Sequence, residues 1–598
     1  GDNFTFYMIP QVLTGNSVTA YVHFTDNTEI TATLKGEWKA GTTRTLKLSE
    51  TRSTWNYVLT PTDPSRAANY DETQSQAYGI TSYRTAPDGT QQAVAWKVVG
   101  YDANGDGTFS MAEKPAWLTS LSKTEGDGGT AADQGTATLT KDVTDLLAKR
   151  NKELKEATAL GSSSAPYDLS TRGGSVNRST ANAYVISAPG HYRIPLVYGN
   201  AIKNGSNNPS SYQTSNTGTY ILSNFQDHAG HAIDNPWIEK TNGGANASVD
   251  GAEVVWADAA DLVHFSSTPI SHDASGNAFL DFEVKQSDIQ SGNAVVAVKK
   301  GGTIVWSWHL WFAPKDALDK ISVTNHQGKV YNFTKETLGW KPTQWSGSTY
   351  DKPRTIKVKV EQTVANSGTK QETVINITQN PGSVKKGATT LYQFGRKDAF
   401  PGVDASELAA NSHFTQNAGD HMSIMNGIQH PDNFYTWGSS WSSTPPTGYS
   451  YYNLWSADNT TTGYNDNSVV KTVYDPCPVG FKMPAPNAFT GFTTTGQTSL
   501  TQSQLNVDGT DNWQTFQNNF GHNFWTSSSK TATINFPASG FRNYSGGSLG
   551  VVGSSGFYWS SVSSGSLGGY SLIFSWGNVY PLGNNNRPYG YAARPVSE

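Results

Sequence analysis

Apolar and polar residues alternate in short runs along much of the chain. Such runs span residues 4–11, 18–26, 30–38 and 44–50, and the alternation returns in 167–200, 292–312 and 354–382. A period of two, with Gly and Asn between the runs, is typical of antiparallel strands joined by tight turns. The pattern therefore predicts a mainly β, multidomain chain of β-sandwich modules.

One segment departs from this period. Within residues 140–158, apolar residues recur at helical spacing among charged neighbours, namely Val143, Leu146, Leu147 and Leu154. This spacing predicts a helix. A polar linker with one or two helical turns fits the segment equally well.

The length of 598 residues is too great for one hydrophobic core. We expect four regions: partial sandwich strands in 1–60, a module in 61–160, a sandwich region in 161–382 that ends with the strands of 354–382, and, after a linker at 383–390, a C-terminal domain in 391–598. Sixty residues are near the lower limit for an independent core, so region 1–60 is expected to need strands upstream of Gly1 or a neighbouring domain. No fixed-period repeat indicates a solenoid or a propeller.

Composition excludes several classes of protein. The net charge is −5 without a basic stripe, so the counterion release that nucleic-acid binding requires is missing. The single cysteine, Cys477, rules out an internal disulfide framework. No run of eighteen apolar residues predicts a membrane span. Stability must therefore come from packing, and no nucleic-acid partner is expected.

The last two hundred residues carry most of the functional information. Their motifs are LYQFGRKD (391–398), NLWSADN (453–459), VYDPCPVGFKMP (473–484), FPASGFRNYSGG (536–547), GFYWSS (556–561) and RPYGYAARPVSE (587–598). Many Trp and Tyr residues with few charges offer flat apolar faces ringed by amides. This chemistry suits the binding of sugars or protein surfaces.

Together these motifs resemble the major paralogous domain of Fibrobacter, a lectin-like module related to the C-type lectin and formylglycine-enzyme folds. The resemblance covers residues 391–598 and implies an α+β lectin-like domain. Residues 1–60 resemble the closing strands of a fimbrillin domain, and 61–160 and 354–382 resemble Ig-like modules of the BACON type. The combination of these modules resembles that of surface proteins, and implies an extracellular protein at the cell surface, attached to a fimbrium or to the outer membrane.

Two functions follow from the resemblance. The first is a non-catalytic fimbrial tip adhesin that joins other pilus subunits by strand addition and binds a glycan or protein ligand through its C-terminal domain. The alternative is a lipid-anchored surface glycan-binding protein of a polysaccharide-utilisation system. Both hypotheses place the ligand site in 391–598.

The candidate ligand-binding residues are aromatic, amide and charged side chains of that region: Trp437, Trp441, Asn453, Asp458, Trp576, Tyr580, Asn584, Asn585 and Arg587. The loops 438–453 and 575–590 are the favoured surface, because loops on a rigid scaffold carry recognition. The alternative is a purely structural role, in which the aromatic residues of the motifs form the core. We expect Trp455, Trp559 and Cys477 to be buried.

A possible calcium site lies in DANGDGTFSMAE. Its residues fill the ligand positions of a twelve-residue calcium loop, namely Asp102, Asn104, Asp106, Thr108, Ser110 and Glu113. The flanking sequence alternates like a strand, and Pro115 stops any exiting helix. A β-hairpin whose tip needs Asn, Asp and Gly explains the same residues. No other cofactor is expected.

No catalytic residue is predicted. Ser548 lies in a G-x-S-x-G match without the strand-turn-helix context that exposes a nucleophile. Cys477 sits between two prolines and is expected to be structural. The histidines at 228, 231, 413, 421 and 430 lack the spacing of zinc proteases and are assigned to loops.

Overall fold

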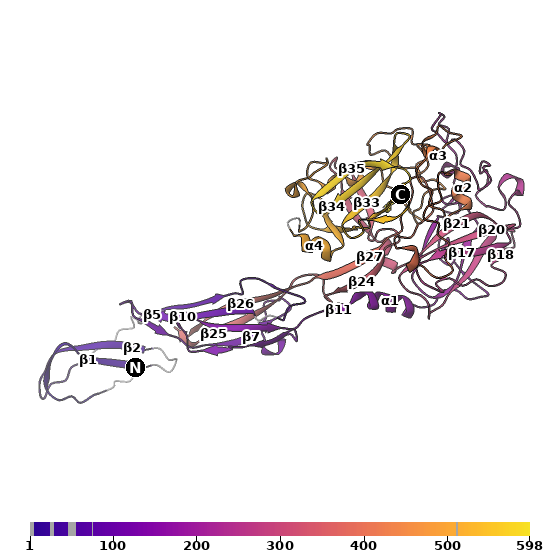
Figure 1. Cartoon of the computed structure of the whole chain (residues 1–598). Coiled ribbons are helices and arrows are strands. Elements are labelled where there is room, and N and C mark those ends of the chain that lie inside the picture. The colour runs from indigo at the N-terminus through magenta and orange to yellow at the C-terminus, as the bar shows by residue number, and fades with distance from the viewer. Residues whose placement is uncertain (1–4, 24–28, 46–54, 74–75, 510–511) are drawn as a thin grey trace. The chain divides into compact units, whose positions relative to one another are not determined.

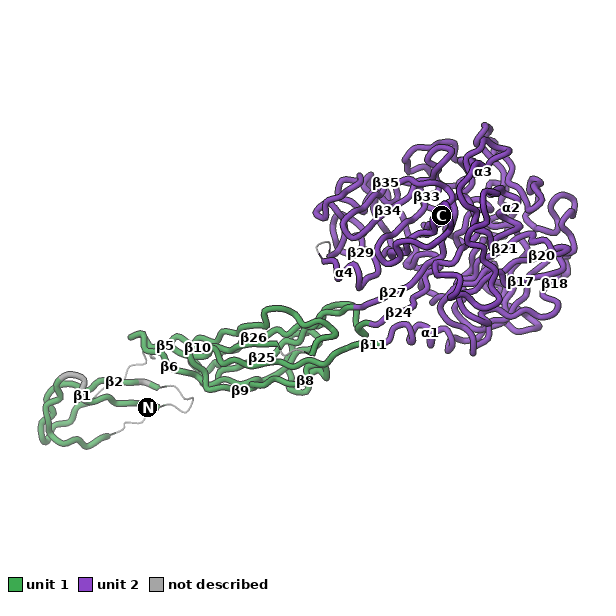
Figure 2. The backbone as a smooth tube through the Cα atoms, in the orientation of Figure 1, with its two compact units in different colours: residues 1–144, 347–382 green, residues 145–346, 383–598 purple. Residues whose placement is uncertain are grey.

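The computed structural model describes residues 5–23, 29–45, 55–73, 76–509 and 512–598. As predicted, the chain is mainly β, with strands far outnumbering helices (Figure 1). It divides into two compact units, which Figure 2 colours separately. Unit 1 comprises residues 1–144 and 347–382, and unit 2 comprises 145–346 and 383–598.

Unit 1 contains a β-sandwich. One sheet has the order β3 (Asn56–Thr62), β5 (Gln76–Thr85), β10 (Gly129–Leu139) and β8 (Leu118–Leu121), with β6 (Gln91–Ala93) paired to β5. The other has the order β4 (Ala68–Asn69), β26 (Thr369–Asn380), β25 (Arg354–Asn366), β7 (Trp96–Asp102) and β9 (Glu125–Gly126). Side chains of both sheets share one core, because every second residue of each strand points inward.

The hairpin of β25 and β26 completes this sandwich. Strand β25 is antiparallel to β7, with Val358 opposite Tyr101 and Val360 opposite Val98. The predicted boundary at 382 agrees with the end of unit 1, but the boundary at 160 is wrong, and so is the assignment of the strands of 354–382 to region 161–382, because these strands belong to unit 1. Residues 145–346 are inserted between two parts of one sandwich.

The hairpin β1 (Gln11–His23) and β2 (Glu29–Trp38) precedes the sandwich. Among the described residues these strands pair only with each other. Large apolar side chains of this segment are exposed, namely Phe6, Tyr7, Ile9, Val12 and Tyr21. The run at 4–11 becomes a strand only from Gln11 onward, and most of the run predicted at 44–50 lies outside the described residues.

Unit 2 contains several small sheets. The first sheet has the order β12 (Tyr167–Asp168), β14 (Gly190–Pro195), β19 (Ala278–Val284) and β18 (Ile270–His272), and the second has the order β13 (Ala183–Ile186), β21 (Thr303–Phe312), β20 (Gly292–Lys300) and β17 (Gly251–Ala257). The third has the order β22 (Lys320–Thr324), β23 (Val330–Thr334), β36 (Val596–Ser597) and β28 (Phe481–Lys482). The fourth has the order β33 (Ser555–Ser564), β34 (Gly568–Ser575) and β35 (Asn578–Asn586). The pairs are β15 (Ile202–Lys203) with β16 (Ser206–Asn207), β29 (Gly521–Trp525) with β30 (Thr533–Pro537), and β31 (Phe541–Arg542) with β32 (Leu549–Gly550). A further sheet joins β11 (Thr144–Asp145), β24 (Lys341–Gly347) and β27 (Ser383–Ala388).

The two chain segments of unit 2 share their cores. One core cluster joins Trp306 to Tyr474, and a second joins Trp311 to Trp455 and Trp559. Strand β36 lies between β23 and β28 in one sheet. Residues 391–598 are therefore not a separate domain, as the sequence had suggested, but one half of unit 2.

The predicted helix in 140–158 is α1 (Leu146–Glu156). Asp145 caps its N-terminus by accepting a hydrogen bond from Ala148 N at 2.9 Å. Leu154 is buried, whereas Val143 precedes the helix and is 52% exposed. The other α-helices are short: α2 (Ile424–Gln429), α3 (Ser439–Ser442) and α4 (Trp513–Asn518). None of the helices in the described ranges is both long and apolar enough to cross a membrane.

Candidate ligand-binding surface

Three of the nine predicted ligand residues are buried and hold the core together. The indole of Trp441 donates to Thr436 O at 3.1 Å, and Asn453 exchanges two hydrogen bonds with the backbone of Leu222. Arg587 donates to Tyr449 O and Tyr451 O, and its guanidinium lies 4.9 Å from the Phe394 ring centroid. Their assignment to a surface site is wrong, since all three side chains are fully enclosed.

The prediction that Trp455, Trp559 and Cys477 are buried is confirmed, because each is 0% exposed. Burial raises the pKa of the Cys477 thiol well above its usual value. A protonated thiol in the core is a poor nucleophile. Cys477 therefore packs the core of unit 2.

The other six predicted residues reach solvent but lie on different parts of unit 2. The carboxylate of Asp458 accepts a hydrogen bond from Thr214 Oγ1 at 2.8 Å. Trp576 is edge-on to Trp513, with ring centroids 5.7 Å apart. Tyr580, Asn584 and Asn585 belong to β35, whereas Trp437 belongs to the loop before α3. The structure thus gives several surfaces instead of one predicted site.

Trp437 is part of a continuous set of partly exposed rings, here called the aromatic platform: Trp437, Phe541, Tyr544, Phe557 and Tyr589. Trp437 is edge-on to Tyr544 at 6.1 Å, and Tyr544 lies 4.8 Å from Tyr589. The ring of Phe541 is 5.3 Å from Tyr589 and 5.1 Å from Phe557. These centroid distances are those of rings in direct contact.

Three polar atoms of the platform have no protein partner. Within the described part of the chain, neither the Tyr544 nor the Tyr589 hydroxyl makes a hydrogen bond to protein, and both atoms reach solvent. The same holds for Nε1 of Trp437, whose side chain is 37% exposed. Partial burial is the main cause that raises the pKa of Tyr589, so this hydroxyl stays protonated and can donate. The platform therefore combines apolar ring faces with free hydrogen-bonding groups.

Hydrogen bonds fix the segments that carry these rings. Strand β31 pairs with β32, and the turn between them carries Tyr544. Arg542 and Gly590 exchange two backbone hydrogen bonds, which bring Tyr589 beside Phe541. Trp437 N donates to Tyr544 O at 2.7 Å. At Gly547 φ is +72°, and a Cβ would lie 1.8 Å from Gln416 O, so only glycine fits the turn.

The buried side chain of Arg542 fixes the position of backbone segments beside the platform. It donates to Pro401 O at 2.8 Å, to Gly547 O at 2.8 Å and to Val403 O at 2.7 Å. Its guanidinium lies 4.4 Å from the Phe414 ring centroid. Three different nitrogens of the planar guanidinium donate to these three carbonyls, whereas the single nitrogen of a lysine cannot occupy all three positions. The platform is therefore held in a fixed arrangement before any ligand arrives.

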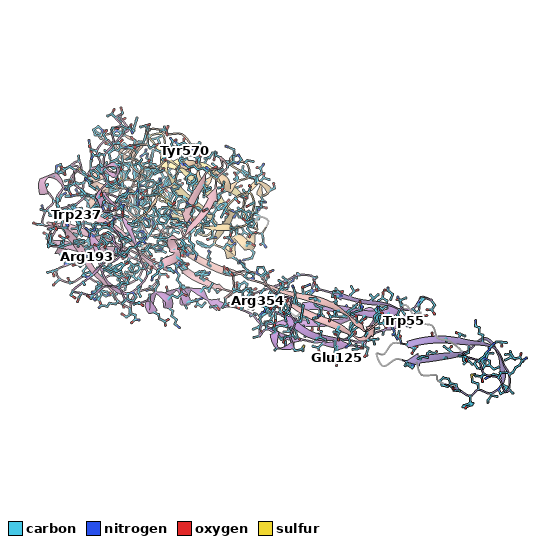
Figure 3. The ribbon with its side chains drawn as sticks, turned by 180° about the vertical axis from the view of Figure 1, so that it is seen from behind. Trp55, Glu125, Arg193, Trp237, Arg354 and Tyr570 are labelled. Atoms are coloured by element: carbon cyan, nitrogen blue, oxygen red, sulfur yellow. The ribbon has the colours of Figure 1, made fainter. Side chains whose placement is uncertain are left out.

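A second aromatic surface lies on the sheet of β33, β34 and β35. We call it the tyrosine face: Tyr464, Tyr570, Ile573, Tyr580 and Asn584. Register places Tyr570 (labelled in Figure 3) opposite Asn584, and Ile573 opposite Tyr580. Tyr464 packs on Tyr570 with ring centroids 4.1 Å apart. The hydroxyls of Tyr464 and Tyr570 already donate to the backbone carbonyls of Leu582 and Thr462 respectively, so neither is free. Within the described residues only the Tyr580 hydroxyl of this face has no protein partner.

The loop of Asp102 to Glu113 is the turn of a β-hairpin, since Tyr101 and Ser110 exchange backbone hydrogen bonds. The Asp102 carboxylate accepts from Gly105 N at 2.6 Å and from Gly107 N at 3.1 Å. The hairpin geometry that the sequence offered as one alternative is therefore present. Calcium binding stays a prediction from the motif. Among the described residues no group of three or more His, Cys, Asp or Glu side chains is arranged to hold a metal.

Ser548 lies in the turn between β31 and β32. In the described part of the chain its hydroxyl has no histidine or carboxylate partner. The structure thus shows no activated serine there.

A family model described as a domain of unknown function (DUF8237) matches residues 494–596. The match contains four of the five platform rings, all except Trp437. No curated protein is significantly similar to the chain.

Sequence reasoning found Trp437 but missed Tyr544 and Tyr589, although both lie in quoted motifs. One feature of the sequence could have indicated that Tyr544 is exposed: it lies in NYSGG, a turn rich in Asn, Ser and Gly, where a ring is not part of a strand that packs on the core. Contact between the distant segments that carry the five rings could not be read from the sequence.

Proposed function

We propose that this protein is a non-catalytic cell-surface adhesin that binds a glycan or protein ligand through the aromatic platform of unit 2. The main support for this proposal is the platform, a set of contiguous, partly exposed rings with three polar atoms that have no hydrogen-bond partner in the described residues. Exposed rings with convergent donors are the usual make-up of a recognition surface. The fixed backbone beneath them reduces the entropy lost on binding.

A fimbrial tip is the setting that we favour, and the extracellular location follows from it. The order of the C-terminal motifs supports this setting through the resemblance already described. The exposed apolar side chains of the β1–β2 hairpin and of the residues just before it also support it, because a two-stranded sheet is marginally stable alone and has open edges. A neighbouring pilus subunit that added a strand would cover both the edges and the apolar residues.

The proposal is tested in cells that lack the protein. Attachment to the target surface should be lost and should return when the gene is restored, whereas pilus assembly should continue. Immunogold labelling should place the protein at pilus ends. Unchanged attachment in the deletion strain would contradict the adhesin function, and recovery only with the outer membrane, never with sheared pili, would contradict the tip location.

A further inference from the structure

From the chemistry of the aromatic platform we infer its ligand class: an uncharged glycan, bound through the face of a pyranose ring. This inference rests on the proposed function, which leaves open whether the ligand is a glycan or a protein. It concerns Tyr544, Tyr589 and Trp437 in particular. Three properties of the platform carry it: ring continuity, unpaired donors and the absence of charge.

Ring continuity supplies the apolar contact. The rings of Tyr544 and Tyr589 are 4.8 Å apart and inclined by 45°, and Phe541 extends the surface at 5.3 Å. One face of a pyranose exposes C–H groups over an area similar to that of one or two aromatic rings. Such a face packs on a partly exposed phenol or indole with little loss of side-chain entropy, since these residues have only two side-chain torsions.

The unpaired donors favour a hydroxyl-rich ligand over an apolar peptide. The Trp437 indole N–H and the two tyrosine hydroxyls belong to rings that contact one another and have no protein partner in the described residues. An apolar side chain seated on the rings would cover these groups without satisfying them, which is unfavourable. Sugar hydroxyls both donate and accept, and therefore can pair with all three.

The absence of charge restricts the class of glycan. Three segments carry platform rings: Asn433 to Ala457 contains Trp437, Asn543 to Asn586 contains Tyr544 and Phe557, and Pro588 to Ala593 contains Tyr589. None of these segments contains a charged residue or a histidine. Arg542 is buried, and its hydrogen bonds go to backbone carbonyls. A carboxylate or sulfate on the ligand would lose water without gaining a cation. Sialylated, sulfated and uronic glycans should therefore bind worse than their neutral counterparts.

A carboxylate beside this loop, Asp420, does not change that conclusion. Asp420 approaches Gly438, the residue after Trp437, and accepts hydrogen bonds from Ser439 Oγ, Ser440 N and Ser440 Oγ. These donors hold its pKa below the usual value, although burial acts in the opposite direction. Asp420 thus remains anionic and further disfavours an acidic sugar.

The tyrosine face provides a matched control within the same unit. Tyr464 and Tyr570 contact each other at a tilt, as Tyr544 and Tyr589 do, but their hydroxyls are already bonded to backbone carbonyls. Removing the Tyr544 or Tyr589 hydroxyl should therefore weaken ligand binding. Removing the Tyr464 hydroxyl should leave ligand binding unchanged.

The experiment uses the full chain and an array of neutral oligosaccharides printed beside their sialylated, sulfated and uronic derivatives, with titration of the strongest neutral glycan. Tyr544→Phe and Tyr589→Phe, which keep the rings, are expected to weaken binding about 5- to 10-fold each. Trp437→Ala should weaken it more than 10-fold. Tyr464→Phe and Trp513→Ala, which change exposed aromatics elsewhere, should bind like the wild type. Circular dichroism checks that every variant is folded.

The outcomes separate this inference from the proposed function. Cell attachment that survives periodate oxidation of the target surface would overturn the glycan ligand and leave the adhesin function standing. Binding confined to acidic glycans, or neutral-glycan binding that the Tyr→Phe variants leave intact, would overturn the assigned site and class. If the full chain bound neither cells nor any glycan, both proposals would fail.

Discussion

Three arginines of unit 2 are buried without a carboxylate partner, and each belongs to one of the C-terminal motifs: Arg542, Arg587 and Arg594. Each guanidinium donates to backbone carbonyls of distant segments and lies over a phenylalanine ring. Arg594, for instance, donates to Thr334 O, Lys335 O and Asn535 O. These residues fix loops that have little regular secondary structure.

The variant Arg542→Lys should destabilise unit 2 by about 2–4 kcal/mol, because an ammonium on a flexible stem leaves at least one buried carbonyl unpaired. Urea unfolding followed by tryptophan fluorescence measures the free energy of unfolding. The exposed Arg172→Lys is the control and should change it by less than about 0.5 kcal/mol. Equal stability of the two variants would contradict the role assigned to Arg542.

His522 should make unit 2 sensitive to acid. Its imidazole donates through Nε2–H to Ser575 O at 2.9 Å and packs among Phe516, Phe524 and Phe574. Burial lowers the pKa of His522 to about 4. The unfolded state, with a histidine pKa near 6.5, then binds more protons than the folded state between about pH 6.5 and 4. The free energy of unfolding therefore falls as the pH falls through this window.

The measurement compares the wild type with His522→Phe, which keeps an aromatic ring at this position. Between pH 7.5 and 4.5 the wild type should lose about 2.5 kcal/mol more than the variant, by the difference in proton binding. Other titrating groups affect both proteins alike and cancel in the comparison. Parallel stability curves would show that His522 is protonated in the folded state.

At the residue scale, the sequence identified some of the buried aromatics, misplaced Trp441 on the surface, and did not show which rings face a common surface. Trp455 and Trp559 were correctly expected inside, because large rings in a small domain serve packing. Arg587 was misassigned, since an arginine near tryptophans can bind a sugar hydroxyl or equally a backbone carbonyl. Only the path of the chain decides between these partners.

At the scale of elements, alternation predicted strands well and their partners poorly. The run at 354–382 does form a hairpin, but β25 pairs with β7, which precedes the inserted residues 145–346. A period of two reports only that one face of a strand is buried. It contains no information on which distant strand lies beside it, and the hairpin of 354–382 was assigned to the wrong region for this reason.

A fragment that joins residues 55–144 to 347–382 through a short Gly-Ser linker should fold as a cooperative sandwich. The two ends are close, because Thr349 N and Oγ1 both donate to the Asp142 carboxylate, at 2.9 and 2.8 Å. Residues 55–144 alone lack β25 and β26 and should not unfold cooperatively. Urea unfolding of both fragments by circular dichroism is the check, and a cooperative transition for 55–144 alone would contradict the assignment.

At the scale of the whole molecule, the division of unit 2 into two chain segments determines which experiments are informative. The C-terminal segment has the whole platform, but its core includes Trp306, Trp311 and Phe333 from the other segment. Asn182 Nδ2 also donates to Val473 O and Asp475 O at 2.7 and 2.8 Å. Deleting either segment therefore exposes the core of the one that remains.

Residues 391–598 expressed alone should consequently be insoluble or lack a cooperative transition, although the motifs make them look like a complete module. Coexpression of 145–346 with 383–598 should restore a soluble complex, because every core contact of unit 2 is then available. Copurification through a tag on one segment, with near-ultraviolet circular dichroism of the complex, tests this. A folded 391–598 that binds the same ligand as the full chain would show that the shared core is dispensable.

Loss of binding after deletion of 391–598 would otherwise reflect unfolding of unit 2 as much as loss of the platform, so point variants of the platform are the decisive probe of adhesion.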